Sequence, residues 1–532
     1  MDIKAQLLRF VPQTKEEAQV RKKMLAAWEA HGKTLLCREN EQAHFTASAL
    51  LLNPAMDKAL MVHHNLFHTF TWPGGHADGE EKLLYTAIRE AREETGVQQV
   101  YPLSAGILSL DILQVPAHSK NGKAVPAHIH YSVAYGLIVP EKQPVFVKPD
   151  ENSAVRWIAV QDLRNYCAEA HMLVLYEKLH RRMKALQAYK KSLYRKLPEA
   201  LLQWYKENAR QLDWRRDTQP YHVWLSEIML QQTRVEAVKG YYARFLEAFP
   251  TIEDLAQARE DTLFKYWEGL GYYNRARNLQ KAAKKIVRDY GGVFPSSYMD
   301  IASLPGVGPY TAGAIASICF EQPRAAVDGN VLRVLSRVTE QFIEVDAPQV
   351  KKEMAQILES VYPLGQCGSF TQSLMELGAT ICLPGGNPKC ACCPARNFCL
   401  AYASGSQQML PVKKPKRARK TEQKTVFLLL CGNDIAVCQR ESSGLLAGLW
   451  QLPNVQGALT EEEAVQTAEN WGSGEITLEK VLHYRHVFTH IQWDMTCYCM
   501  CCTQKAPDFT WGTMEQVRQK YALPTAFRIF LE

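Results

Sequence analysis

Two clusters of side chains have the residue types and spacing of metal sites, and the first is acidic. Glu90, Glu93 and Glu94 fall at positions i, i+3 and i+4 within "YTAIREAREETG". On a helix these positions share one face. Like charges crowded there gain nothing by themselves, whereas Mg²⁺ takes hard oxygen ligands and a diphosphate supplies the rest of its shell. We therefore predict a magnesium site on this helix.

The second cluster consists of cysteines in the pattern C-x7-C-x2-C-x5-C, namely Cys382, Cys390, Cys393 and Cys399. Four thiolates after a helical region suit either zinc or a [4Fe–4S] cluster, and the spacing alone does not choose between them. We interpret Cys392, a fifth cysteine in the same stretch, as a bystander. The later run "CYCMCC" alternates as a strand does, which favours buried thiols over another metal site.

Polar residues in the middle of the chain suggest acid–base chemistry. Glu227 lies in the apolar stretch "WLSEIMLQQT", where a carboxyl tends to stay protonated and suits a general acid. Asp328 and Asn330 in "VDGNVLRVLSR" stand at a predicted helix start, where an aspartate also serves as an N-cap. The loop "LPGVGPYTAG" has the form of a helix-hairpin-helix turn, in which Gly306 and Gly308 let the backbone approach a phosphate. The aromatic and arginine mixture of "GLGYYNRARNL" suits stacked bases and phosphates.

The elements that must position these residues divide the 532-residue chain into several domains. Strand and helix patterns alternate at both ends, while the middle shows helical periods cut by Gly and Pro. The run "VKKPKRARKTEQK" is typical of an exposed basic linker. We predict α/β ends around an all-α centre, with these parts: residues 1–180 with a trailing helix, 181–380 all helical, 381–402 the cysteine loop, 403–424 the linker, and 425–532.

The bulk composition describes an ordinary globular protein. Hydrophobic residues make up 47% and charged residues 22%, and the formal net charge of +7 is compatible with a polyanionic partner. No stretch has the pattern of a transmembrane span, and the first residues lack a signal-peptide apolar core. We expect a cytoplasmic monomer without a membrane partner, whose fifteen cysteines are thiols or metal ligands.

The segment "GGHADGEEKLLYTAIREAREETGV" resembles the Nudix hydrolases. It fits the box G-x5-E-x7-R-E-U-x-E-E-x-G-U from Gly75 to Val97, and Ala91 alone departs from the bulky apolar position. The resemblance implies an α/β Nudix domain that uses Mg²⁺ to cut a nucleoside di- or triphosphate derivative. It gives Arg89 the role of orienting one glutamate. The remaining box positions, which shape the turn and the helix ends, are Gly75, Glu81 and Gly96.

From about residue 197 to the end, the chain resembles the A/G-specific adenine DNA glycosylases. The motifs "LLQWYKENARQLDWR", "PYHVWLSEIMLQQT", "GLGYYNRARNL", "LPGVGPYTAGAI" and "DGNVLRVLSR" and the cysteine cluster occur in the family's order. The resemblance implies a helix-hairpin-helix domain with a [4Fe–4S] loop that hydrolyses the N-glycosidic bond of an adenine paired with 8-oxoguanine or guanine in double-stranded DNA. Its functional residues would be Glu227 as general acid, Asp328 stabilising the oxocarbenium-like sugar, Tyr310 and Asn330 supporting the pocket, and Gln232 and Tyr272 in the base stack.

Two positions depart from this family's pattern. The first cysteine gap is seven residues where six is common, and Asp213 stands where a proline is common. A third position separates the chain from bifunctional relatives, which carry a Schiff-base lysine where Tyr310 stands. Water should therefore be the attacking species, so we predict a monofunctional enzyme.

The C-terminal part resembles the Nudix-like domain of the same glycosylase family. "QRESSGLLAGLWQLPN" matches, but "EEEAVQTAENWG" lacks the Arg-Glu and Glu-Glu pairs in the register that holds Mg²⁺. We therefore expect residues 425–532 to bind rather than to cut. The resemblance implies that Phe488, Thr489 and His490 contact 8-oxoguanine in DNA.

The sequence thus predicts a DNA-repair enzyme with two hydrolytic centres, the first acting on 8-oxo-dGTP or a similar nucleotide. Three alternatives stay open. The glycosylase part could be a thymine-mismatch or endonuclease III-like glycosylase, the whole chain could be a non-catalytic sensor of mispairs, and the N-terminal domain could be a regulatory module or act on another nucleotide.

Overall fold

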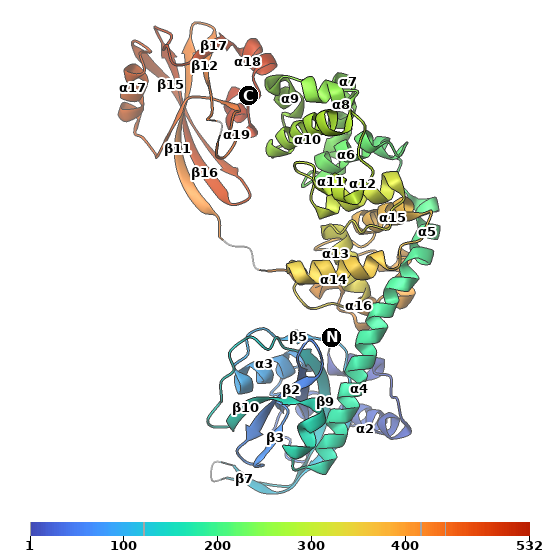
Figure 1. The fold of residues 1–532 in the computed structure, drawn as a ribbon. Coiled ribbons are helices and arrows are strands. Elements are labelled where there is room, and N and C mark those ends of the chain that lie inside the picture. Colours follow the sequence, from blue (N-terminus) through green and yellow to red (C-terminus); the bar gives the residue numbers. More distant parts are fainter. Residues whose placement is uncertain (1, 121–122, 415–417, 442) are drawn as a thin grey trace. The chain divides into compact units, whose positions relative to one another are not determined.

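The computed structural model describes residues 2–120, 123–414, 418–441 and 443–532 (Figure 1). The chain forms two compact units: residues 1–209 with 327–414, and residues 210–326 with 415–532. Each unit therefore contains one α/β domain and part of the helical middle. Residues 415–417 of the predicted basic linker lie outside the described residues. No helix of the described ranges has the length and apolar character needed to cross a membrane.

The first unit opens with an α/β domain built on a central parallel strand pair. β1 (Ala43–Leu52) lies parallel to β9 (His128–Ile138) along its whole length. β1 is buried on both faces, as expected for a central strand: Phe45 and Leu51 face one hydrophobic core, and Leu50 and Leu52 face the other. The other strands of this sheet are β2 (Lys58–His64), β3 (Thr69–Thr71), β4 (Gly74–His76), β5 (Tyr101–Pro102), β6 (Ser109–Val115) and β10 (Asn152–Ala159).

Helices cover both faces of this sheet. A separate two-stranded sheet consists of the hairpin of β7 (His118–Lys120) and β8 (Lys123–Val125). The long α4 contributes Tyr176 and Leu179 to one core, while α1 and α3 contribute to the other. The buried face of α3 carries leucines and alanines, and the helix ends at Gly96, whose φ of 74° provides the left-handed cap. The helices are α1 (Ile3–Arg9), α2 (Lys15–His31), α3 (Leu83–Thr95) and α4 (Ala170–Ser192).

The middle of the chain is helical, as predicted, because the described residues contain no strand between β10 and β11. The helices of the first unit are α5 (Leu197–Asn208), α13 (Gly329–Val338), α14 (Pro348–Glu359), α15 (Cys367–Thr380) and α16 (Leu400–Ser404). Those of the second unit are α6 (Pro220–Leu230), α7 (Val235–Ala248), α8 (Ile252–Gln257), α9 (Glu260–Trp267), α10 (Asn274–Tyr290), α11 (Tyr298–Ala302) and α12 (Pro309–Phe320).

The second unit ends in another α/β domain with the same pattern of strand pairing. β11 is parallel to β16 and antiparallel to β12 and β14, as β1 is to β9, β2 and β4. Its elements are β11 (Lys420–Cys431), β12 (Asp434–Gln439), β13 (Trp450–Gln451), β14 (Asn454–Gln456), α17 (Glu461–Asn470), β15 (Ile476–Val487), β16 (Ile491–Cys502), β17 (Thr510–Thr513), α18 (Met514–Lys520) and α19 (Thr525–Arg528).

Candidate active sites

A buried acidic site forms where α3 packs against β4. Glu90 and Glu94 are 9% and 4% exposed, respectively. The backbone N–H of Gly74 donates to Glu94 Oε1 at 2.8 Å, and Arg89 Nη2 donates to Glu90 Oε1 at 2.7 Å. A Cβ on Gly75 would lie 2.5 Å from the carboxyl carbon of Glu90, so only glycine leaves this carboxylate its place. The glycines of the box thus shape the carboxylate site directly.

The third carboxylate at this site is Glu151, which the sequence analysis missed. Oxygen atoms of Glu90, Glu94 and Glu151 lie within 4.8 Å of one another. The predicted ligand Glu93 is half-exposed and lies 3.7 Å from Lys148 Nζ and 3.9 Å from Arg89 Nε. Glu151 follows a loop far along the chain, where no periodic pattern marks it.

The electrostatics of this site favour a cation. Burial, together with the neighbouring carboxylates of Glu90 and Glu151, raises the pKa of Glu94 to about 8, although the hydrogen bond from the Gly74 amide opposes this shift. Hard oxygen ligands packed this closely suit a divalent ion such as Mg²⁺, which offsets the cost of burying their charges. The box residue Glu81 lies apart from them, in an ion pair with Lys33.

The helical middle brings Glu227 and Tyr310 together within the second unit. Glu227 is 7% exposed on α6, beside the buried Trp224 and Ile228. Tyr310 lies in the first turn of α12, and its hydroxyl donates to Glu227 Oε2 at 2.6 Å. A buried carboxyl that accepts this hydrogen bond can keep a proton on its other oxygen, as a general acid requires.

In the first unit, Asp328 is the N-cap of α13. Its Oδ1 accepts from the backbone N–H groups of Asn330 at 2.9 Å and Val331 at 2.8 Å, and its Oδ2 accepts from Asn330 Nδ2 at 2.8 Å. Burial raises the pKa of Asp328, while these hydrogen bonds oppose that shift. Arg333 Nη2 holds the Asn330 amide oxygen at 2.8 Å. The arrangement fixes a carboxylate at a helix N-terminus, where the dipole favours negative charge.

The hairpin turn before α12 has the geometry of an anion site. Gly306 has a φ of 76°, and a Cβ there would lie 2.7 Å from the Asn278 side chain. Gly308 is the N-cap of α12 and has open space around the position of a Cβ. The backbone N–H groups at a helix start favour a phosphate, which suits this turn to an anion.

Arg275 is a positioning residue that the sequence analysis did not single out. Its Nη1 donates to the carbonyls of Ile228, Met229 and Gln231 at 2.7–2.9 Å, and its Nη2 donates to those of Leu270 and Gly271 at 2.9 and 3.1 Å. Burial lowers its pKa to about 10. This one guanidinium joins two loops, and the exposed residues predicted to enter the base stack, Gln232 and Tyr272, follow these carbonyls.

Both of these exposed residues have left-handed backbones, with φ of 57° at Gln232 and 49° at Tyr272. Non-glycine residues adopt that conformation at a cost, which Arg275 helps to offset. The Tyr272 hydroxyl lies 2.9 Å from Thr489 Oγ1 in the C-terminal domain of the same unit. Thr489 and His490 are exposed, whereas Phe488 packs on Trp493 with ring centroids 4.8 Å apart.

The four predicted cysteine ligands gather around two short turns after α15. Burial, together with the nearby Cys382 and Cys390, raises the pKa of Cys393 to about 12 and that of Cys399 to about 11. Arg337 Nη1 donates to Cys382 Sγ at 3.2 Å. Cys392 is exposed, in keeping with its interpretation as a bystander.

Comparisons with known proteins agree with this architecture. Residues 225–363 match the HhH-GPD superfamily of base excision DNA repair proteins, and residues 42–179 and 425–532 each match a NUDIX domain. The adenine DNA glycosylase of Rattus norvegicus is 33% identical over 399 residues, covering 62% of this chain and 77% of that protein. The adenine DNA glycosylase of Homo sapiens is 33% identical over 401 residues, covering 62% and 73%. A solved thermostable thymine-DNA glycosylase is 29% identical and covers 41% of this chain and 98% of its own, with a TM-score of 0.36. The predicted order of a Nudix domain, a helix-hairpin-helix domain and a second Nudix domain is confirmed.

Proposed function

Since the chain belongs to the adenine DNA glycosylase family, we propose that it excises adenine paired with 8-oxoguanine or guanine in double-stranded DNA. The observation that carries this proposal is the buried Glu227 carboxyl with the Tyr310 hydroxyl 2.6 Å from its Oε2. In this mechanism Glu227 protonates the flipped adenine, which weakens the N-glycosidic bond. Asp328 stabilises the positive charge that develops on the sugar, and water completes the hydrolysis.

The test is single-turnover release of adenine from a duplex that contains A opposite 8-oxoguanine. Glu227→Gln should bind this duplex with near-normal affinity and lose at least about 1,000-fold in rate, because Gln cannot donate the acid proton. Tyr310→Phe removes only the hydrogen bond to Glu227 and should lose about tenfold. Near-normal excision by Glu227→Gln would show that the assigned acid is wrong. Absence of excision by the wild type would revive the mispair-sensor alternative.

We propose that the reaction ends at an intact abasic strand. Tyr310 is a phenol, and it stands where bifunctional relatives carry a lysine that forms a Schiff base. Product strands should break only after alkali is added. Efficient borohydride trapping of wild-type protein on DNA would contradict this.

We propose that Cys382, Cys390, Cys393 and Cys399 hold a [4Fe–4S] cluster. A tetrahedral zinc ion with bonds of about 2.3 Å needs sulfur atoms about 3.8 Å apart. Within the described ranges, the groups of three or more ligand atoms that lie within 4.8 Å of one another do not include these thiols. The resemblance to the adenine glycosylases favours the iron–sulfur cluster, which would hold the loop of residues 382–399. Gently purified protein should contain about four irons per chain, and stoichiometric zinc without iron would contradict the proposal.

For the N-terminal domain we propose Mg²⁺-dependent hydrolysis of a diphosphate-linked nucleotide, with 8-oxo-dGTP as the preferred substrate. Glu90, Glu94 and Glu151, with Glu93 from the box, would hold the metal, which when bound lowers the pKa of an attacking water and neutralises diphosphate charge. Arg89 orients the Glu90 carboxylate. We choose 8-oxo-dGTP because the glycosylase part is proposed to act on DNA that contains the same oxidised base. A panel of nucleoside triphosphates, nucleotide sugars and dinucleoside polyphosphates tests it, and no turnover of any would leave a regulatory module.

We also propose that the C-terminal domain recognises 8-oxoguanine through Thr489 and His490. The hydrogen bond between Thr489 and Tyr272 supports this role. Because of this bond, Thr489, which lies in the turn between β15 and β16, is next to a residue predicted to enter the base stack. A binding function also agrees with the lack of paired glutamates on α17.

A further inference from the structure

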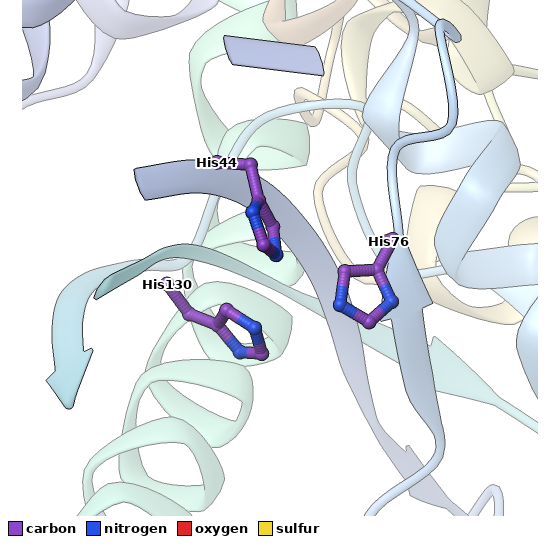
Figure 2. Close-up of side chains that lie close together, drawn as sticks. All are labelled: His44, His76 and His130. Atoms are coloured by element: carbon purple, nitrogen blue, oxygen red, sulfur yellow. The ribbon is translucent and has the colours of Figure 1, made fainter. Parts of the chain in front are cut away.

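Three histidines come together at one end of the central strands of the N-terminal sheet, outside the carboxylate site (Figure 2). His44 lies on β1 and pairs in register with His130 on the parallel β9. His76 lies on β4, which pairs antiparallel with β1 two residues further along. One ring nitrogen from each of the three lies within 4.8 Å of the other two, and the ring centroids are 4.9–5.1 Å apart. The strand register therefore collects three imidazoles that are widely separated in the sequence.

His44 is oriented as metal-binding histidines are. Its Nδ1 lies 3.1 Å from the carbonyl oxygen of Asn40, which fixes the proton on that nitrogen. The other nitrogen, Nε2, is buried and has no hydrogen-bond partner, although the residue is only 4% exposed. A backbone carbonyl on one ring nitrogen is the usual support of a histidine whose other nitrogen binds a metal. An orphan nitrogen at this depth is costly unless something occupies the cluster.

Hydrogen bonding also fixes the tautomer of His130. His128 Nδ1 donates to the carbonyl of Pro126 at 2.9 Å, so its Nε2 carries no proton and accepts from His130 Nε2 at 3.0 Å. In that tautomer His130 Nδ1 is unprotonated. His44 and His130 thus each present an unprotonated nitrogen, which is the state that a metal ion requires.

We propose that His44, His76 and His130 bind one divalent transition-metal ion of the class that prefers imidazole, such as Zn²⁺. Bonds of about 2.1 Å in a tetrahedral site need nitrogens about 3.4 Å apart. Small rotations of the terminal ring torsions close the difference from 4.8 Å, since those torsions have broad minima. Three protein ligands leave the fourth position to water or to a substrate oxygen.

This site is separate from the carboxylate site but adjoins it. His76 follows Gly75, the residue whose missing Cβ makes room for Glu90. Nitrogen ligands select a borderline ion such as zinc, while the oxygen ligands of the carboxylate site select magnesium. One strand therefore connects two sites of different ligand chemistry.

The test is zinc binding to the full-length chain. Protein purified with its iron is freed of loosely bound metal, equilibrated with micromolar Zn²⁺ by dialysis and analysed for zinc and iron in the same sample. Wild type should bind about one zinc per chain, and X-ray absorption at the zinc edge should show nitrogen and oxygen ligands without sulfur. Sulfur ligation would place the zinc on the cysteines and overturn the proposal, as would the absence of bound zinc.

Variants assign the metal to these residues. His76→Ala and His130→Ala should each weaken zinc binding at least about tenfold while iron content stays unchanged. They are made separately, so that one variant that fails to fold leaves the other to decide. His171→Ala, at an exposed histidine on α4, is the matched control and should bind zinc like wild type. Glu94→Gln should also retain the zinc, since it changes the neighbouring site. Wild-type zinc affinity in both His76→Ala and His130→Ala would overturn the proposal.

Discussion

The two α/β domains share one pattern of strand pairing but differ at the residues that could do chemistry. The backbone N–H of Ala49 donates to the Pro73 carbonyl, and that of Phe427 donates to the Pro453 carbonyl, so the two frameworks can be superposed residue by residue. In that superposition Gly75 matches Val455, because each pairs with the equivalent residue of the central strand. Val455 thus carries a side chain at the strand position where Gly75 leaves room for the Glu90 carboxylate.

The helices that follow these strands show the same contrast. α3 buries Glu90 and Glu94 four residues apart, whereas α17 buries Ala464 and Ala468 at the same spacing. Three of the four glutamates of α17 lie in its first turn, where Glu463 completes a capping box with Thr460. The buried carboxylates of α3 form the acidic site, whereas Glu463 of α17 stabilises the N-terminus of its helix. The fold is shared, and the side chains at the helix–strand contact decide whether metal chemistry is possible.

The three-histidine cluster also occurs in only one of the two domains. The positions that match His44, His76 and His130 carry Glu422, Gln456 and Trp493. Trp493 Nε1 donates to Glu422 at 3.2 Å, so a hydrogen bond within the sheet takes the place of the cluster. The C-terminal domain has neither set of metal ligands at these positions, which agrees with a binding role.

Among changes that test the difference between the two α/β domains, Glu94→Gln is expected to have the largest effect on activity. Loss of a buried ligand should reduce Mg²⁺-dependent diphosphate hydrolysis at least about 100-fold, measured as release of phosphate or pyrophosphate. Glu462→Gln on α17 is the matched control in the other domain and should leave hydrolysis unchanged. Equal loss in both variants would break the distinction between the domains.

Exchanging the residues at the strand contact should have the next largest effect. Gly75→Val places a side chain where Glu90 now lies, and the flexible carboxylate moves rather than the backbone, so the chain should fold. Hydrolysis should fall at least about tenfold. The reciprocal Val455→Gly should gain no activity, because the buried residues of α17 are alanines and include no glutamate. Full activity in Gly75→Val would show that the glycine is not needed for the site.

The buried carboxyl of α3 also predicts a pH dependence of stability without metal. The pKa of Glu94 is raised from 4.5 to about 8 in the folded state, so the folded chain holds a proton there that the unfolded chain has lost. The stability that this proton provides is complete below pH 4.5 and is lost as the pH rises through 8. In EDTA, the thermal midpoint of the N-terminal domain should fall by several degrees, roughly 5 °C, between pH 5 and pH 8 relative to Glu94→Gln. Parallel curves for the two proteins would contradict the assignment.

The smallest effect is expected on the preference between duplexes when Thr489 and His490, in the turn between β15 and β16, are changed. Replacing both Thr489 and His490 with Ala should reduce the preference for A opposite 8-oxoguanine over A opposite guanine, while slow excision of the latter persists. Tyr272→Phe removes only the hydrogen bond to Thr489 and should reduce that preference a few-fold. Equal loss on both duplexes would mean that the pair is structural.

The sequence predicted those parts of the sites that depend on spacing along one element. Glu90 and Glu94 share a helix face because of their four-residue interval, and Asp328 caps a helix because it precedes one. The pairing of Tyr310 with Glu227 joins two separate helices, and the family resemblance, rather than any spacing, placed both in one pocket.

Residues that the strand register or a loop brings into place could not be predicted from local patterns. Glu151 enters the acidic site from the loop before β10, and the three histidines are single residues in three separate strands. Arg275 belongs to a motif whose arginines suggested phosphate contacts, yet its guanidinium holds five backbone carbonyls. Such roles depend on tertiary contacts, which cannot be predicted from periodic patterns in one sequence.

The most direct test of two independent hydrolytic centres measures both reactions in one preparation of the full chain. Adenine release from a duplex with A opposite 8-oxoguanine and Mg²⁺-dependent hydrolysis of 8-oxo-dGTP are followed for wild type, Glu227→Gln and Glu94→Gln. Wild type should perform both reactions, Glu227→Gln only the second and Glu94→Gln only the first. Loss of both reactions in either variant, or excision by Glu227→Gln at the wild-type rate, would contradict the account.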